Sequence, residues 1–142
     1  MIQQAYITSE PCAARAKGAE VVFLKASDAG WNPYGSLLTL PEPLPKWAPA
    51  FVAATQAAWA AYMNAPDRAN AEIVRLNDQM TPALLQCISE MQATFVTGTD
   101  GMGAMRAARW DAMAATLVEL DLLPDGTSAT GSWVMLQEAA GR

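Results

Sequence analysis

Short apolar runs separated by turn residues dominate the first 40 positions. After the first run, Pro11 suits the opening turn of a helix, and Gly18 suits its end because glycine readily adopts the left-handed conformation. The second run, VVFL, is uninterrupted, as in a strand buried on both faces. The runs predict three strands, the first two forming a parallel β-α-β unit: residues 6–8, 21–24 and 36–40.

From residue 45 onward, apolar positions recur at helical spacing. Pro66 interrupts the first helical stretch, and Thr81 followed by Pro82 is a typical N-cap and first-turn pair. The run WVML near the end fits either a last strand or a helical tail. The pattern predicts four helices: residues 45–64, residues 67–76, a helix after Thr81, and residues 105–122.

These elements predict an α/β fold with a small sheet of three or four strands followed by about four helices. At 142 residues the chain is expected to form one domain. Its parts are a strand-rich region over 1–40, a helical region over 45–123, and a loop and tail over 124–142.

The composition is apolar for a globular domain. Hydrophobic residues make up 52% of the chain and charged residues 16%, with eight Met and five Trp. A large core is the plainer account, and apolar surface for a partner or ligand is the alternative.

Charge and hydropathy exclude two classes of partner. The net charge is −5 and the basic residues form no run, so we expect no nucleic-acid binding. No window approaches the roughly 18 continuous apolar residues of a membrane span. The first residues, MIQQAYITSE, lack the features of a secretion signal, which predicts a cytoplasmic protein if Met1 is the true start.

The sequence offers little for catalysis. It contains no histidine, which removes the Ser-His-Asp and Cys-His arrangements and the commonest metal ligand. Cys12 and Cys87 have no metal-type spacing and are expected to be two buried thiols. We therefore predict no enzyme activity, no cofactor and no metal site.

Three features remain as binding candidates. The loop GTDGMG lacks a phosphate-loop fingerprint and is expected to cap the next helix. Trp31 and Tyr34, in the turn WNPYG, could stack on a planar ligand or plug the loop onto the core. Glu10 and Asp28 each follow a predicted strand, where ligands gather in open α/β sheets, and could hydrogen-bond a small molecule.

The order of these pieces resembles the later portion of periplasmic substrate-binding proteins of ABC transporters. The branch most similar in appearance handles thiamine-pyrimidine precursors and aliphatic sulfonates. The resemblance covers nearly the whole chain and rests on the order of its segments rather than on one motif: QQAYITSEP, VVFLKASDAGWNPYGSLLTL, ATQAAWAAYMNAP and GMGAMRAARWDAMAATLVELDLLPDG.

The resemblance implies a non-catalytic solute-binding module, the C-terminal half of a two-lobe fold that closes around a small polar or aromatic solute. It implies periplasmic location and delivery of the solute to an ABC permease. Tyr6, Ser9 and Glu10 would face the ligand, with Trp31 and Tyr34 on a following loop. A related thiamine-pyrimidine synthase is nearly excluded, because that family depends on active-site histidine.

The resemblance also suggests an alternative function. Because half of the family's pattern is missing, sheet edges would be exposed, and a homodimer is expected. The alternative is thus an oligomeric interaction protein derived from such a lobe, with no retained ligand binding.

Overall fold

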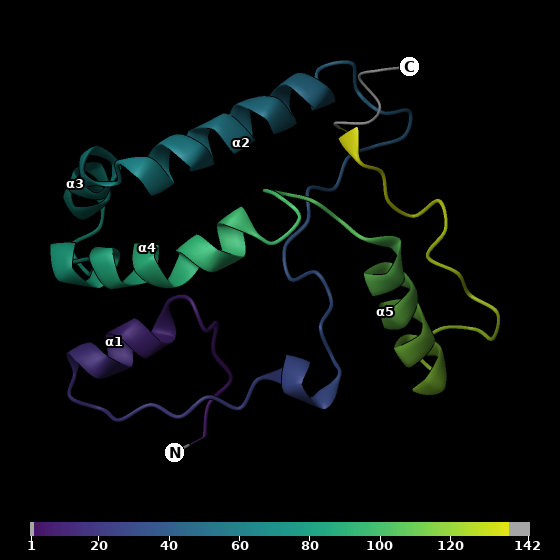
Figure 1. The fold of residues 1–142 in the computed structure, drawn as a ribbon, viewed down its shortest axis with the longest axis horizontal. Helices are drawn as coiled ribbons and strands as arrows, with labels where there is room; N and C mark the ends of the chain where they lie inside the picture. Colours follow the sequence, from purple (N-terminus) through teal and green to yellow (C-terminus); the bar gives the residue numbers. More distant parts are fainter. Residues whose placement is uncertain (1, 137–142) are drawn as a thin grey trace. The chain divides into compact units, whose positions relative to one another are not determined.

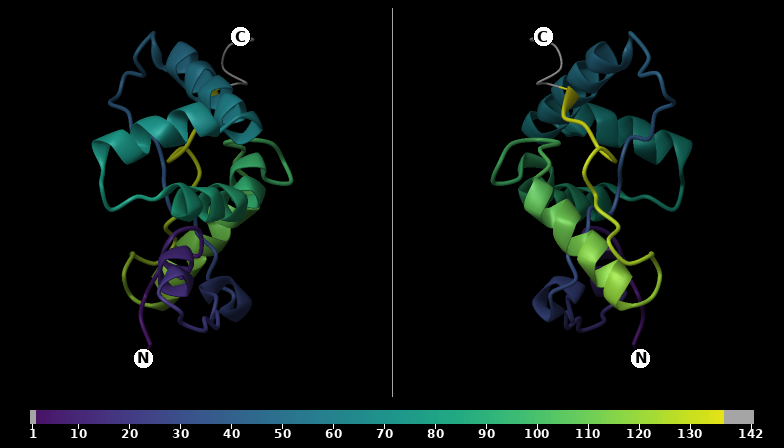
Figure 2. Two further views of the ribbon diagram at one scale, coloured as in Figure 1. Left: turned by 90° about the vertical axis from the view of Figure 1, so that its left-hand side faces the viewer. Right: turned by 90° about the vertical axis from the view of Figure 1, so that its right-hand side faces the viewer.

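The structure is a computed structural model that describes residues 2–136, and across that range it consists of helices joined by loops (Figures 1 and 2). Figure 1 labels the elements except η1, a short 3-10 helix. In chain order they are α1 (Glu10–Ala16), η1 (Ala26–Ala29), α2 (Ala48–Asn64), α3 (Asp67–Leu76), α4 (Pro82–Thr97) and α5 (Ala107–Glu119). The helices themselves agree with the ranges predicted from the sequence, to within a few residues at their ends.

The predicted α/β fold is wrong. Within residues 2–136 there is no strand and no sheet, so the lobe of three or four strands is replaced by an all-helical architecture. The segments expected as strands lie in turns or irregular backbone: 6–8, 21–24, 36–40 and 133–135. The physical reason is that a strand bonds only to another strand, whereas a helix satisfies its backbone groups internally.

The apolar run at 21–24 shows how the strand prediction failed. Val22 and Leu24 are each 87% exposed, while the residues between and before them are half-buried. The ring of Phe23 lies beneath the guanidinium of Arg15 in α1, with 5.6 Å between the guanidinium carbon and the ring centroid. The run therefore has only one covered face instead of the two that were expected.

Local signals explain where α4 begins and where α1 ends. The Thr81 hydroxyl accepts a hydrogen bond from the backbone N–H of Leu84 at 3.2 Å, and Pro82 occupies the first turn of α4. This is the predicted N-cap, which satisfies an amide that has no partner within the helix. After α1, Gly18 has a φ of 81°, a left-handed conformation that glycine adopts without strain.

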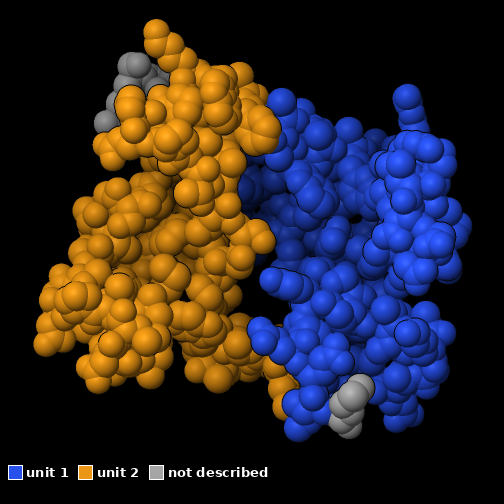
Figure 3. Space-filling model, turned by 180° about the vertical axis from the view of Figure 1, so that it is seen from behind, with its two compact units in different colours: residues 1–23, 54–103 blue, residues 24–53, 104–142 orange. Residues whose placement is uncertain are grey.

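The chain forms two compact units (Figure 3). Unit 1 comprises residues 1–23 and 54–103, and it contains α1, most of α2, α3 and α4. Unit 2 comprises residues 24–53 and 104–142, and it contains η1, the start of α2 and α5. Each unit is therefore assembled from segments far apart in the sequence.

Unit 2 is built around an aromatic cluster on α5. Trp110 is 8% exposed and packs with Ala114 and Ala129. The rings of Tyr34 and Trp110 lie 5.4 Å apart, and the ring of Trp133 is nearly parallel to that of Trp110 at 6.1 Å between centroids. These contacts bring the predicted WNPYG turn and the segment after α5 onto one helix.

Buried hydrophobic side chains are few for so apolar a sequence. In the described range they number seven, whereas sixteen large hydrophobic side chains are exposed. The seven are Cys12, Ala48, Leu85, Trp110, Ala114, Ala129 and Leu136. A large core therefore does not account for the composition, and the alternative of apolar surface for a ligand or partner gains weight.

Candidate functional site

A half-open groove of about 970 Å³ lies within unit 1, where α3 and α4 meet the end of α2. That volume falls at the upper end of the roughly 300–1,000 Å³ of small-molecule sites. Unit 1, which contains the whole lining of the groove, is blue in Figure 3. The groove is lined by Met63, Pro66, Asp67, Asn70, Ala71, Val74, Pro82, Ala83, Gln86, Ser89, Glu90 and Ala93.

The lining combines an apolar surface with a few polar groups. Proline, alanine, Met63 and Val74 supply the apolar part, while α3 and α4 each contribute a carboxylate, Asp67 and Glu90. A mostly apolar surface with a small number of polar groups is the usual composition of a ligand site.

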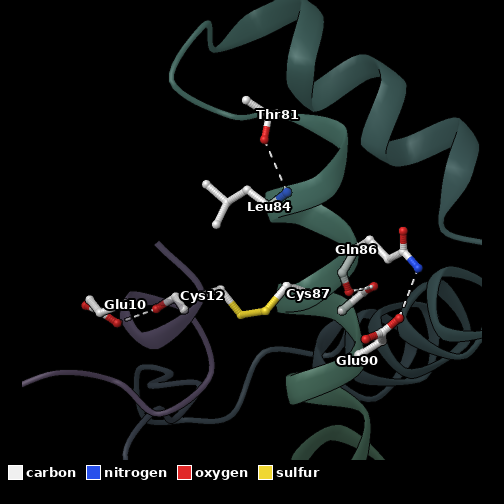
Figure 4. The surroundings of a disulfide bond; sticks show 9 residues. Glu10, Cys12, Thr81, Leu84, Gln86, Cys87 and Glu90 are labelled. Atoms are coloured by element: carbon white, nitrogen blue, oxygen red, sulfur yellow. Dashed lines mark hydrogen bonds between the residues drawn. A yellow bond between two sulfur atoms is a disulfide. The ribbon is translucent and has the colours of Figure 1, made fainter. Parts of the chain in front are cut away.

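Hydrogen bonds fix several of the groove's polar side chains. The Tyr62 hydroxyl donates to Oδ1 of Asn70 at 2.9 Å and ties α2 to α3. Partial burial raises the pKa of Tyr62 above its ordinary value. On α4, the Gln86 amide donates to Oε1 of Glu90 at 3.1 Å, one turn further along the helix (Figure 4).

A disulfide joins the wall of this groove to the first helix. Cys12 in α1 and Cys87 in α4 are bonded, with their Cα atoms 5.9 Å apart (Figure 4). The prediction of two buried thiols is therefore wrong, although Cys12 is indeed buried. Cys87 immediately follows the groove residue Gln86, so the cross-link fixes the part of α4 that carries the groove's polar side chains.

Three of the predicted ligand-facing residues lie together at the start of α1. Tyr6 and Glu10, with Gln4 and Ala5, line a small surface hollow of about 230 Å³ in unit 1. The Tyr6 backbone N–H donates to Oε2 of Glu10 at 3.1 Å, and the Ser9 hydroxyl donates to the same oxygen. The Ser9 hydrogen bond is the main cause that lowers the pKa of Glu10.

The other two predicted residues belong to unit 2. The Tyr34 hydroxyl accepts a hydrogen bond from the backbone N–H of Arg106 at 2.7 Å, and its ring lies 4.1 Å from the guanidinium carbon of Arg109. Tyr34 thus holds its loop on α5. This agrees with the second of the two alternatives given for it, a loop held on the core by its aromatic side chains. Trp31 is 37% exposed and lies outside that aromatic cluster.

The predicted site residues are therefore gathered only in part. Tyr6, Ser9 and Glu10 meet in one turn, whereas Trp31 and Tyr34 are held in the other unit. Asp28 lies exposed in η1, also in unit 2.

The glycine-rich loop at residues 98–103 belongs to unit 1 and contacts α2. The Gln56 amide in α2 donates to the carbonyl of Met102 at 2.8 Å. Gly98, Gly101 and Gly103 all have positive φ, and a Cβ added to Gly103 would lie 3.5 Å from the Gln56 amide nitrogen. The loop thus connects α4 to the segment before α5. The expectation that it caps α5 is wrong, because the N-cap position of that helix is Arg106, which lies after the loop.

Sequence reasoning missed the groove, although part of its signal was visible. Gln86 and Glu90 are spaced i, i+4, and Asp67 and Asn70 are spaced i, i+3, so each pair shares a helix face. Nothing in the spacing says that α3 and α4 face each other, because that contact is made by tertiary packing.

Metal ligands and membrane spans are both lacking in the described range. Residues 2–136 contain no group of three or more His, Cys, Asp or Glu side chains placed to hold a metal ion. None of the helices there combines the length and the apolar character needed to cross a membrane.

No protein-family model, curated protein or solved structure matches this chain.

Proposed function

We propose that this protein is a non-catalytic binding module for a small solute and that the groove between α3 and α4 is its binding site. The observation that carries the proposal is the groove itself, with ligand-sized volume, apolar walls and polar groups held by hydrogen bonds. The resemblance to ABC-transporter substrate-binding proteins supports solute binding, and an ABC permease is part of the same proposal as a partner. The proposal does not include the α/β lobe implied by that resemblance, because the described residues contain no sheet.

The disulfide supports the periplasmic alternative for location over the cytoplasmic one. Disulfides persist in oxidising compartments such as the bacterial periplasm, and are rare in the cytosol. A cross-link between Cys12 and Cys87 is the kind of bond that such a compartment preserves.

A second candidate function is oligomeric assembly. The exposure of Val22, Leu24 and other large hydrophobic side chains supports it, because exposed apolar side chains are what an interface with another chain would cover. Sedimentation of the purified protein separates the two functions, since an assembly unit forms a dimer without any ligand.

The test of solute binding is a ligand screen with two blocking variants. The wild-type protein would be screened by thermal melting against pyrimidines, sulfonates, carboxylic acids and amines, because a ligand that binds the folded state raises the melting temperature. Ala83→Phe places a bulky side chain in the groove, and Glu10→Ala removes the carboxylate of the smaller hollow. Ala112→Phe, at an exposed position on α5, is the matched control.

We expect stabilisation by at least one class of compound, lost in Ala83→Phe and retained in Ala112→Phe and Glu10→Ala. Loss in Glu10→Ala alone would move the site to the hollow at residues 4–10. No stabilisation by any class, confirmed by direct titration, would refute solute binding.

A further inference from the structure

The groove carries negative charge and lacks any basic side chain. Its lining includes Asp67 and Glu90, together with amide and hydroxyl groups, but no Lys or Arg. Within the described residues the ion pair formed on these helices joins Glu72 to Arg75, and neither residue lines the groove. A ligand entering the groove therefore meets two carboxylates without basic side chains beside them in the lining.

The hydrogen bond of Gln86 adds a further acceptor beside these carboxylates. The Gln86 side-chain nitrogen is directed to Glu90, which leaves the side-chain amide oxygen of Gln86 as a further acceptor on the same wall. The α4 wall thus presents acceptors that suit a ligand with N–H donors, whereas on α3 the Asn70 oxygen is already engaged by the Tyr62 hydroxyl.

Most of the remaining lining residues are apolar and favour a ligand with an apolar portion. Met63, Val74 and the prolines and alanines of α3 and α4 form the apolar surface. Contact with such a surface requires an apolar body, because a small hydrated cation would gain nothing there.

We propose that the ligand of the groove is an organic cation, an amine or ammonium group on an apolar body, with Asp67 and Glu90 holding the charged group. This inference rests on the proposed solute-binding function and names the chemical class of the solute. Both carboxylates are exposed enough to be reached from solvent, so a diffusing cation can reach them.

The test uses three compounds with one shared body: 4-phenylbutylamine, 4-phenylbutanol and 4-phenylbutyrate. They are, in turn, cationic, neutral and anionic at neutral pH. Binding to the wild-type protein would be measured by titration followed by NMR, at low and at high salt. The same titrations would be run on the double variant Asp67→Asn, Glu90→Gln.

The control variant is Asp111→Asn, Glu119→Gln. It makes the same change in net charge on exposed positions of α5, in the other unit. It therefore reports the effect of overall charge without touching the groove.

We expect the amine to bind about tenfold more tightly than the butyrate, the range that two partly exposed charge pairs provide. Salt should reduce this difference because it screens such pairs. The difference should vanish in Asp67→Asn, Glu90→Gln, with binding of the alcohol unchanged, and persist in the α5 control.

Other outcomes overturn the inference. If all three compounds bind equally at the groove, solute binding stands and the cation preference is wrong. If the amine binds best but the groove variant changes nothing, the cation is held elsewhere. If none of the three binds but the ligand screen finds another stabilising compound, the inference alone fails. If the screen finds none either, the inference and the solute-binding function both fail.

Discussion

The two units are held together by different means. Unit 1 joins α1 to α4 by a covalent bond between Cys12 and Cys87 and leaves a groove beside it. Unit 2 has no disulfide in its described residues and relies on the aromatic cluster around Trp110. A cross-link lets a unit keep an open hollow without a packed core, whereas a unit without one must bury its aromatic side chains.

Removing the disulfide should have the largest effect. In the chain-entropy model a bond closing a loop of 75 residues stabilises the folded state by about 4.5 kcal/mol. We expect the double variant Cys12→Ala, Cys87→Ala to lose about that free energy of unfolding in urea. Hydrogen exchange should then rise in α1 and α4 far more than in α5.

The control for this prediction is the wild-type protein treated with a reducing agent, which opens the bond without changing a side chain's size. Equal loss of protection in α5 would mean that the units unfold together and would contradict the comparison.

Trp110→Ala should produce the converse pattern. Emptying the centre of the aromatic cluster is expected to cost about 3 kcal/mol, with increased exchange in α5 and little change in α1. Trp110→Phe should cost clearly less, because the buried indole N–H has no hydrogen-bond partner and its removal leaves nothing unsatisfied. A Phe variant as unstable as the Ala variant would show that this account of the cluster is wrong.

The success and failure of the sequence predictions have one physical basis. The start of α4 could be predicted because Thr81 and Pro82 act on amides within their own turn. The strand predictions at 21–24 and 36–40 failed, because a strand needs a second strand to pair with and no local pattern supplies one. The bond between Cys12 and Cys87 and the groove are likewise non-local, since they depend on which helix faces α4.

The N-cap of α4 offers a smaller perturbation within unit 1. Thr81→Ala removes the acceptor for the Leu84 N–H and should cost about 1 kcal/mol of unfolding free energy. Thr81→Ser keeps the hydroxyl and should cost only a fraction of that. The cap lies nearly two turns before the cross-linked Cys87. We therefore expect hydrogen-exchange protection to fall in the first turn of α4 and to persist around the disulfide. Uniform loss along α4 would contradict this.

Glu10 should give the smallest effect, visible as a pH dependence. Its pKa is lowered in the folded protein, chiefly by the Ser9 hydroxyl, so the contribution is fully present above the ordinary value of 4.5. It is lost as the pH falls through the lowered folded-state pKa. Urea unfolding at a series of pH values should show this loss in the wild-type protein and a flatter profile in Glu10→Gln. Identical profiles would rule out the Glu10 contribution.

The bond between Cys12 and Cys87 also changes how the chain responds to cutting. Residues 12–87 form a covalent ring, and that ring includes the 24–53 segment of unit 2 as well as most of unit 1. A single protease cut anywhere inside the ring leaves one molecule of unchanged mass, apart from the added water, until a reductant is present. The molecule can therefore be nicked in an exposed loop between residues 12 and 87 and still keep both pieces tethered. Within that range the cross-link guards against fragmentation as well as adding stability.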